Sequence, residues 1–350
     1  MKRILTLLLF IPFLLNAQIG NSNQGISNTI GNGGVGFVSQ GGGETWAESM
    51  FASYLSINDH ITFTEAQQDT ILKILSNPYV INTFGEDGLG KTTCDFFLYF
   101  ETSNKTTNLS TRTETKTGET LRWIKDTISA NAISQNNLPA TTCSNGWLAV
   151  TSTDGFDGWT TFDINTNTFT LCPAIHWATP TIIYAHINSL TSFKTYSTWT
   201  SLARLYLHSN YANLNINIPA YSTWTTMQYL FWYSDAMTGT IPLIGQNAAV
   251  TLYYRMQTND FTSSTLTTFR KGLIELNLQA NDFSIAEVNA LLAAMDAWYV
   301  GANLMTQNCT VTLDGVGMGA PTGGDLNTNI VSLIAKATGA GKTWAFVINY

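Results

Sequence analysis

The feature that most constrains the fold is a repeat of 21 to 25 residues in the second half of the chain. One polar position recurs six times, and its members are Asn167, Asn188, Asn210, Asp235, Asn259 and Asn281. The positions three and five residues before it are apolar in every copy, and a tryptophan stands eleven residues before it in three consecutive copies. Separate columns that share one period predict stacked copies of a single structural unit.

The spacing of the apolar columns indicates what that unit is. Two apolar residues separated by one other residue are typical of a short strand with one buried face, and strands of successive units would stack in parallel about 4.8 Å apart. An asparagine at the exit of such a strand carries both a donor and an acceptor. It is therefore expected to satisfy main-chain groups that lose their partners where the strand becomes a loop.

The best copy of the unit lies between Leu273 and Phe283, where the sequence follows L-x-x-L-x-L-x-x-N-x-L with Phe in the last apolar position. This pattern resembles the leucine-rich-repeat family of bacterial-type secreted and surface proteins. The resemblance implies a β-rich α/β solenoid over residues 156–350, a short array of parallel strands that ends in a C-terminal cap. In that family, ligands bind the concave face formed by the strands.

The cap is predicted from a change of period after Phe283. Residues 285–300 have apolar side chains at helical spacing, with Ser284 as N-cap. A strand over 309–313, a helix over 326–337 and a final strand over 343–349 complete the expected cap.

The first 43 residues are interpreted as a targeting segment and a linker. Residues 1–17 have the basic start, apolar core and small-residue end of a signal peptide, so we expect a secreted or cell-surface protein. Residues 18–43 are rich in Gly, Asn and Ser, which is typical of a linker. No stretch is long enough for a comfortable membrane span.

Residues 44–93 predict a small helix-containing region. Thr62 and Glu65 fit a capping box for a helix over 63–76, and residues 79–84 are strand-like. Residues 85–92 fit the phosphate-loop pattern G-x-x-x-x-G-K-[ST]. The residues that follow favour a strand over the helix that this motif requires, so a glycine-rich turn is the preferred interpretation over nucleotide binding.

Residues 94–155 predict a small β module, with strand-like runs near 96–101, 120–125 and 147–152. They loosely resemble immunoglobulin-like or PKD-like modules, which implies a β-sandwich-like region before the repeats. Such a module would cap the first coil of the solenoid. Four cysteines, Cys94, Cys143, Cys172 and Cys309, allow three pairings in an oxidising compartment, of which Cys94 with Cys143 is favoured.

The outward positions of the predicted strands define a candidate ligand surface. Its members are Tyr184, His186, Arg204, Tyr206, His208, Tyr229, Phe231, Tyr233, Tyr253, Arg255 and Gln257. Exposed aromatic rings with a few donors suit a protein or glycan ligand. The competing interpretation is that Tyr and Phe only stabilise the sheet as cross-strand pairs.

Other chemistries have weaker support in the sequence. His186 and His208 share a column, but no third metal ligand accompanies them. No nucleophile elbow, H-E-x-x-H motif or spaced carboxylate pair is present, so neither an enzyme nor a cofactor is predicted. A net charge of −7 with 16 basic residues makes nucleic acid an unfavourable partner. We expect a non-enzymatic recognition or adhesion protein; the alternative is a structural protein that self-associates in a surface layer, filament or virion appendage.

Overall fold

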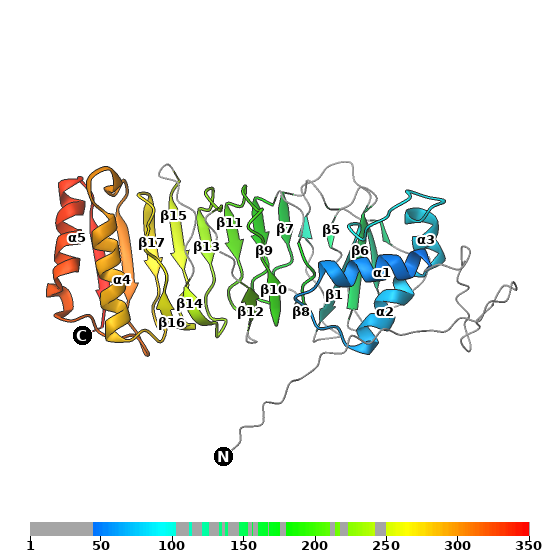
Figure 1. The fold of residues 1–350 in the computed structure, drawn as a ribbon, viewed down its shortest axis with the longest axis horizontal. Helices are drawn as coiled ribbons and strands as arrows, with labels where there is room; N and C mark the ends of the chain where they lie inside the picture. Colours follow the sequence, from blue (N-terminus) through cyan, green and yellow to red (C-terminus); the bar gives the residue numbers. More distant parts are fainter. Residues whose placement is uncertain are drawn as a thin grey trace, which may run out of the picture.

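The computed structural model describes residues 45–102, 112–113, 121–125, 133–134, 137–138, 147–152, 156, 160–166, 168–175, 180–210, 214–217, 223–241 and 250–349. The expected signal peptide, the linker, Asn167 and Cys143 lie outside these residues. The chain forms an elongated parallel β solenoid whose strands follow one another along the long axis (Figure 1). This confirms the solenoid and repeat architecture expected from the columns.

An eight-stranded parallel sheet runs the length of the solenoid in the order β19-β18-β17-β15-β13-β11-β9-β7. The strands are β7 (Thr161–Asp163), β9 (Ile182–Tyr184), β11 (Arg204–Tyr206), β13 (Tyr229–Phe231), β15 (Leu252–Arg255), β17 (Leu273–Asn277), β18 (Cys309–Leu313) and β19 (Trp344–Ile348). Equivalent residues stand side by side: Leu205 pairs with Ile183 on one side and with Leu230 on the other. These apolar residues are fully buried, whereas their neighbours on the same strands are half-buried on the outer face.

The back of the solenoid, opposite the main sheet, contains short strands and, in two of its coils, the buried side chains of Trp199 and Trp224. Two pairs of parallel strands lie there, β10 (Ser192–Lys194) with β12 (Asn215–Asn217) and β14 (Thr238–Ile241) with β16 (Asp260–Ser264). The rings of Trp199 and Trp224 stack with centroids 6.0 Å apart, and both are fully buried. Their indole N–H groups donate to main-chain oxygens of the preceding coil at 3.2 and 2.9 Å. The tryptophan column is therefore the back wall of the core.

The polar column forms an asparagine ladder inside the solenoid, which we define as Asn188, Asn210, Asp235, Asn259 and Asn281. Asn259 is typical of it: Nδ2 donates to the oxygens of Trp232 and Met256, at 2.7 and 3.2 Å. Its Oδ1 accepts from the backbone N–H groups of Asp235 and Met237. One side chain thus satisfies four main-chain groups on two coils, as the sequence predicts.

Each ladder residue follows a residue in the left-handed region, and none of these is glycine. The φ angles lie between 52° and 61° at Ile187, Ser209, Ser234, Thr258 and Ala280. Their N–H groups donate to the next coil, as from Ile187 to the oxygen of His208 at 3.0 Å. These hydrogen bonds continue the parallel pairing beyond the strand and offset a conformation that side chains disfavour.

The C-terminal coils contain helices in place of the back strands. Helix α4 (Ile285–Trp298) starts at Ser284, whose hydroxyl accepts from the Glu287 N–H in a capping box, and α5 (Thr328–Gly339) lies between β18 and β19. Short 3-10 turns precede β18 and α5, η1 (Gly301–Asn303) and η2 (Gly324–Leu326). All four predicted elements of this end are confirmed, within two residues at their boundaries. The strands β18 and β19 extend the main sheet, so this end continues the solenoid.

Three helices form the N-terminal region: α1 (Trp46–Ile57), α2 (Glu65–Leu75) and α3 (Pro78–Phe84). The predicted helix is confirmed as α2, but its capping box is Thr64 with Gln67, two residues later than expected. The strand predicted over 79–84 is wrong. Asn77 caps this segment and Pro78 is its first residue, a combination that fixes a helical start despite the β-branched residues that follow.

The phosphate-loop pattern is a turn between a helix and a strand. Residues 85–92 follow α3, and the chain continues through turns into β1 (Phe97–Thr102) with no helix in the fully described stretch 85–102. The main-chain oxygen of Lys91 accepts a hydrogen bond from the Trp46 indole N–H at 2.8 Å. The turn therefore lacks the strand-loop-helix arrangement that directs N–H groups at a phosphate.

A five-stranded sheet in the order β4-β3-β6-β1-β8 separates the helices from the solenoid. Its strands include β3 (Leu121–Lys125), β4 (Ile133–Ser134), β6 (Trp147–Ser152) and β8 (Phe169–Leu171), while β2 (Arg112–Thr113) pairs with β5 (Asn137–Leu138). One face packs on the helices and the other on the first coils. We call this five-stranded sheet the capping sheet; together with the separate β2–β5 pair it is what the described residues show of this region, and they do not confirm the expected β-sandwich.

Three cysteines are buried free thiols in this structure: Cys94, Cys172 and Cys309. Burial raises the pKa of each thiol above its ordinary value. In the part of the chain that is described, no helix combines the length and apolar character needed to cross a bilayer.

Candidate functional site

The outer face of the parallel sheet brings the predicted ligand residues together. All eleven are half-buried side chains that point away from the core, as expected for the positions between and beside the buried ones. The strand register aligns them into columns, for example Tyr184, Tyr206 and Phe231 on β9, β11 and β13. Ten of them form one network of ring and cation contacts. We call these ten residues the aromatic face; they are Tyr184, His186, Arg204, Tyr206, His208, Tyr229, Phe231, Tyr233, Tyr253 and Arg255.

The rings of the aromatic face stack on one another along the solenoid. Tyr229 and Tyr253 are parallel within 3° with centroids 5.0 Å apart. His208 and Tyr233 are parallel within 4° at 4.3 Å, and His186 stacks on His208 at 4.5 Å. Because the rings face each other, their edges and polar tips are directed outward. The surface is thus a row of ring edges and hydroxyl groups, held about one strand spacing apart.

Tyr206 is at the centre of the network. Its ring lies 4.9 Å from that of Tyr184 and 4.7 Å from that of Phe231, the latter edge-on. Burial raises the pKa of its hydroxyl above the ordinary value, so it remains a neutral donor at physiological pH.

The two arginines of the face have different surroundings. Arg255 lies 4.6 Å from the centroid of Phe231 and is held by Glu275 through Nε and Nη2, at 2.9 to 3.0 Å. Arg204 lies 5.1 Å from the Tyr229 centroid, and a hydrogen bond with the Tyr184 side chain raises its pKa. Among the described residues, Arg204 has no carboxylate within ion-pair distance. The face therefore presents one positive charge that is not neutralised.

The histidines of the face are arranged as stacked rings and not as metal ligands. Their planes meet at only 26°, so the ring nitrogens lie side by side and do not converge on a shared point. Burial, with smaller contributions from His186 and Arg255, lowers the pKa of His208 to about 4. His208 is consequently neutral near pH 7. Across the described ranges, no three His, Cys, Asp or Glu side chains are grouped as a metal site would need.

Gln257 is the one predicted ligand residue outside the network. It is half-buried on the coil after Tyr233, and its main-chain oxygen accepts from the Ser234 N–H at 3.2 Å. Its side-chain oxygen is covered and has no hydrogen-bond partner among the described residues. Glu275, by contrast, belongs to the electrostatics of the face although it was not a predicted site residue. Its position opposite Tyr253 in the same outward column, diagonal to Arg255, is the sequence signal that identifies it.

Beneath the aromatic face lies the one acidic member of the asparagine ladder. Asp235 is 1% exposed, and its Oδ1 accepts from the Asn210 N–H at 2.5 Å. Its Oδ2 is buried and has no partner among the described residues, whereas Asn210 and Asn259 use an N–H₂ group at the equivalent place. Burial raises the pKa of Asp235 to about 8, so the carboxyl is mostly protonated at neutral pH. The protonated oxygen can then donate as the amide does.

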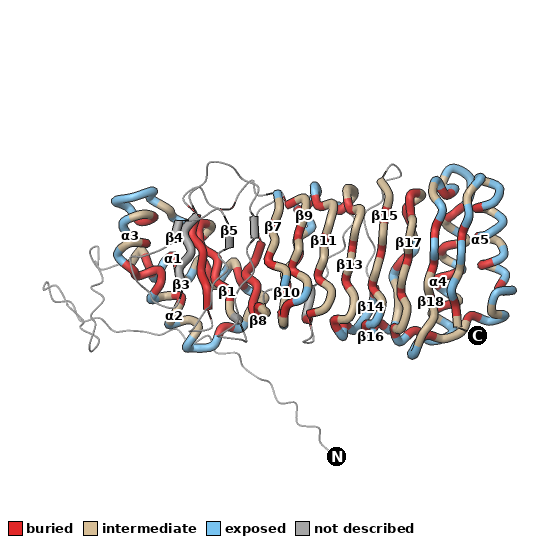
Figure 2. Tube along the Cα trace, turned by 180° about the vertical axis from the view of Figure 1, so that it is seen from behind, coloured by how far each residue is buried: buried red, intermediate tan, exposed pale blue. Residues whose placement is uncertain are grey.

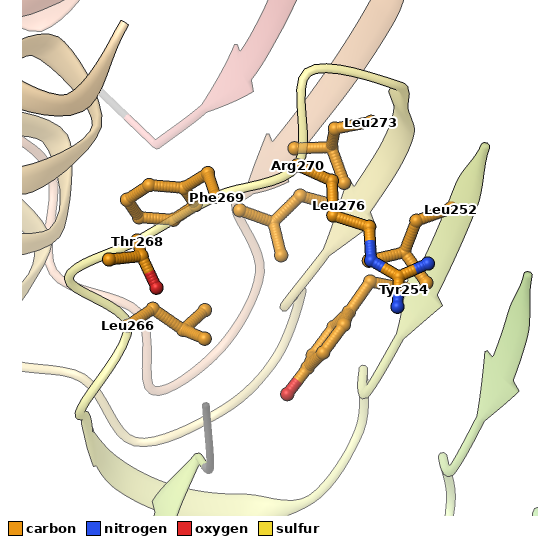
Figure 3. A pocket seen from close by; sticks show the side chains of 8 residues that line it. All are labelled: Leu252, Tyr254, Leu266, Thr268, Phe269, Arg270, Leu273 and Leu276. Carbon is orange, nitrogen blue, oxygen red and sulfur yellow. The ribbon is translucent and has the colours of Figure 1, made fainter. Parts of the chain in front are cut away.

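A separate pocket lies inside the solenoid, on the other side of the sheet (Figure 3). It is lined mainly by apolar side chains, with the guanidinium of Arg270 beside Leu252 and Tyr254. That guanidinium donates to the main-chain oxygens of Trp224, at 2.7 Å, and Met227, and burial lowers its pKa to about 10. Arg270 thus connects coils from within, and the pocket is part of the packed core.

Comparisons with protein-family models, with curated proteins and with solved structures found no match to this chain. The aromatic face therefore has to be interpreted from its own chemistry.

Proposed function

We propose that this chain is a secreted or cell-surface recognition protein, whose leucine-rich-repeat-like solenoid binds a protein ligand through the aromatic face. The observation that carries the proposal is the continuity of that face: aromatic side chains from four adjacent strands contact one another, and each is half-buried in the free chain. Rigid aromatic residues lose little conformational entropy on binding, and Tyr and Arg dominate the energetics of protein interfaces.

Ring orientation favours a protein over a carbohydrate. Sugars bind to aromatic residues that present a free ring face, but here Tyr229 covers Tyr253 and Tyr233 covers His208. Ring edges, phenol hydroxyls and a guanidinium remain for the ligand. These groups suit a polypeptide that provides apolar side chains and main-chain carbonyls.

The charge of the face defines the ligand further. Arg204 is available for a carboxylate, whereas Arg255 is already paired with Glu275. We therefore expect the ligand to place an acidic side chain near β11, beside apolar groups that pack on Tyr206 and Phe231. Such a contact would contribute more to specificity and association rate than to affinity.

The test is an array of extracellular proteins, peptides and glycans probed with the purified chain. Binding to polypeptides that is lost in Tyr206→Ala/Phe231→Ala, and that becomes less salt-dependent in Arg204→Gln, supports the proposal. Thr312→Ala is the matched control, because Thr312 is on the same sheet face on β18, outside the aromatic face. Thermal melting of each variant checks that the fold is retained.

Three results would contradict the proposal. Binding to glycans alone would show that the ring edges accept sugars. Binding that survives the double substitution would place the ligand elsewhere. A change from oligomer to monomer in Tyr206→Ala/Phe231→Ala would favour the alternative, in which this face is a subunit contact of an assembly.

A further inference from the structure

The two ends of the solenoid differ in what covers them. At the N-terminal end, Phe162 and Phe169 of the first coil are covered by Phe100 of the capping sheet, with ring centroids 6.5 and 5.1 Å apart, and the helices lie behind that sheet. At the C-terminal end, β19 pairs with β18 on one side, and no other described strand pairs with its second side. Figure 1 shows α5 at the end of the molecule, and β19 is the last strand in the order of the main sheet.

Exposed apolar side chains gather near this C-terminal end. Three of the ten large hydrophobic residues that are exposed in the described part of the chain belong to α5 and β19, namely Val331, Ile334 and Val347. Figure 2 shows the exposed outer side of α5 at the extreme end of the tube. Solenoids need a polar outer surface on the terminal repeat to stay soluble as monomers, so an apolar end calls for a covering partner.

The exposed side of α5 points out of the end of the solenoid. Lys336 faces α4, where its Nζ binds an Asp296 carboxylate oxygen at 2.6 Å. At about 100° per residue, Val331, Ile334 and Thr338 lie on the side of the helix opposite Lys336. Val331 is 49% and Ile334 40% exposed, so the outward stripe of the last helix is apolar.

The edge strand β19 has none of the features that protect natural sheet edges. Its sequence, Trp-Ala-Phe-Val-Ile, contains no charge, proline or glycine. Trp344 and Ile348 point inward and are buried, while Phe346, which also points inward, is half-buried. Val347 is 44% exposed on the outer face. We call β19 with Val331, Ile334 and Thr338 the terminal face.

We propose that the terminal face joins two copies of this chain end to end, with the two β19 strands pairing antiparallel about a two-fold axis. An axis perpendicular to the sheet keeps the inner faces of both sheets on the same side. Because α5 packs behind β19 through Ile330 and Leu333, the two α5 helices would then meet behind the joined sheets. One symmetry operation covers both the open strand edge and the apolar helix stripe.

Chemical self-complementarity is the reason to choose a second copy as the occupant. In a two-fold symmetric contact the same surface of both copies meets, so a patch that carries charges of one sign would repel the same patch on the other copy. Neither β19 nor the helix stripe has an ionisable side chain, and the neighbouring Lys336 is neutralised by Asp296. The occupant must also offer a strand with free N–H and C=O groups and no charge, which β19 itself provides.

The test measures mass and shape together. Light scattering after size-exclusion chromatography, between about 1 and 100 µM, spans the affinities of transient and stable homodimers. We expect the mass of two chains at the upper end of this range, and small-angle scattering with a maximum dimension nearly twice that of the monomer. Amides of β19 should exchange more slowly in the dimer than in the monomer.

Two variants locate the contact. Val331→Glu/Ile334→Glu should give a monomer with little change in melting temperature, since both residues are exposed in the isolated chain. Val316→Glu is the control, because Val316 is 93% exposed and follows Gly315, which lies beside Ala280 of the preceding coil and away from the terminal face. That variant should remain a dimer.

A monomer over the whole concentration range would overturn the proposal. So would equal dissociation in the control, a dimer no longer than the monomer, or a mass that keeps rising above two chains. If the double variant fails to fold, hydrogen exchange of the β19 amides in the unmodified chain decides instead. An exchange rate that does not change with protein concentration would overturn the proposal.

Discussion

Asn210 and Tyr206 lie four residues apart on one coil, and both belong to columns that repeat with the solenoid. Asn210 is fully buried and its amide donates to main-chain oxygens of two coils. Tyr206 is half-buried and contacts other side chains. A buried position that must satisfy backbone groups tolerates little variation, whereas a half-exposed stacking position accepts Tyr, Phe or Arg. The inner column therefore holds the fold and the outer column can be adapted to a ligand.

The strongest way to test this difference is to remove one rung of the ladder. Asn259→Ala leaves four main-chain groups without their partner, so we expect a loss of about 3–5 kcal/mol in the free energy of unfolding. Chemical denaturation followed by circular dichroism measures it. Gln257→Ala, two residues away on the outer face, is the control and should cost about 1 kcal/mol or less. Equal losses in both variants would contradict the distinction.

Replacing the acidic rung should stabilise the solenoid. The pKa of Asp235 is raised from 3.8 to about 8, so its contribution to stability is fully present below pH 3.8 and is lost as the pH rises through 8. Asp235→Asn should leave stability near pH 4 almost unchanged and increase it at pH 8, by on the order of 1–3 kcal/mol.

The reciprocal substitution provides the control for this effect. Asn210→Asp should introduce the same loss of stability with rising pH in the neighbouring coil. Melting temperatures measured from pH 4 to 8 would show this loss and its absence in Asp235→Asn. The titratable side chain near Asp235 on its own coil is Tyr233, while His208 and Arg255 lie on the outer face of the adjacent coils. A flat difference between wild type and Asp235→Asn across this range would refute protonation of the buried carboxyl.

Ring stacking on the aromatic face should contribute less to the free energy of unfolding. Each contribution should come from one pair of neighbouring rings. A double-mutant cycle on Tyr229→Leu and Tyr253→Leu is expected to give a coupling energy of about 0.5–1.5 kcal/mol, because the two rings are parallel and 5.0 Å apart. A cycle on Tyr184 and Tyr253, which are separated by two strands, should give no coupling. Coupling of equal size in both cycles would mean that the face acts as one cooperative unit.

Protonation of the histidine stack should change the free energy of unfolding only in acid. The pKa of His208 is lowered from 6.5 to about 4, so its stabilising contribution is present above pH 6.5 and is lost as the pH falls towards 4. NMR titration of the ring protons should show a midpoint near 4, against an ordinary midpoint in the unfolded chain. His60 is also lowered to about 4, mainly by burial, so His208→Gln is needed to separate the two contributions to stability.

Sequence periodicity predicted much of this architecture, because the columns report directly on which side chains face the core. The positions of Asn210 and Leu205 fixed both the strand and its exit, and Ser284 with Glu287 fixed the start of α4. Pairings between distant segments were not predictable. Nothing in residues 169–171 indicates that β8 pairs antiparallel with β1, since that contact depends on the placement of the capping sheet.

The candidate site was predictable in its membership but not in its geometry. Outward positions follow from strand alternation, which identified Tyr206 and His208. Ring stacking depends on side-chain rotamers and on strand spacing, so the parallel arrangement of His208 and Tyr233 was not visible in the sequence. The same is true of the left-handed residues such as Ile187, because β-branched side chains normally argue against that conformation.

The position of β8 has a mechanical consequence. This strand belongs to the first coil by connectivity, yet it is hydrogen-bonded to β1 of the capping sheet through Leu171 and Phe169. A force that pulls the helical end away from the repeats would load those hydrogen bonds together with the Phe100 contacts. Tension applied at the helical end would thus pass into the repeats through two kinds of contact, the β1–β8 hydrogen bonds and the packed phenylalanine rings.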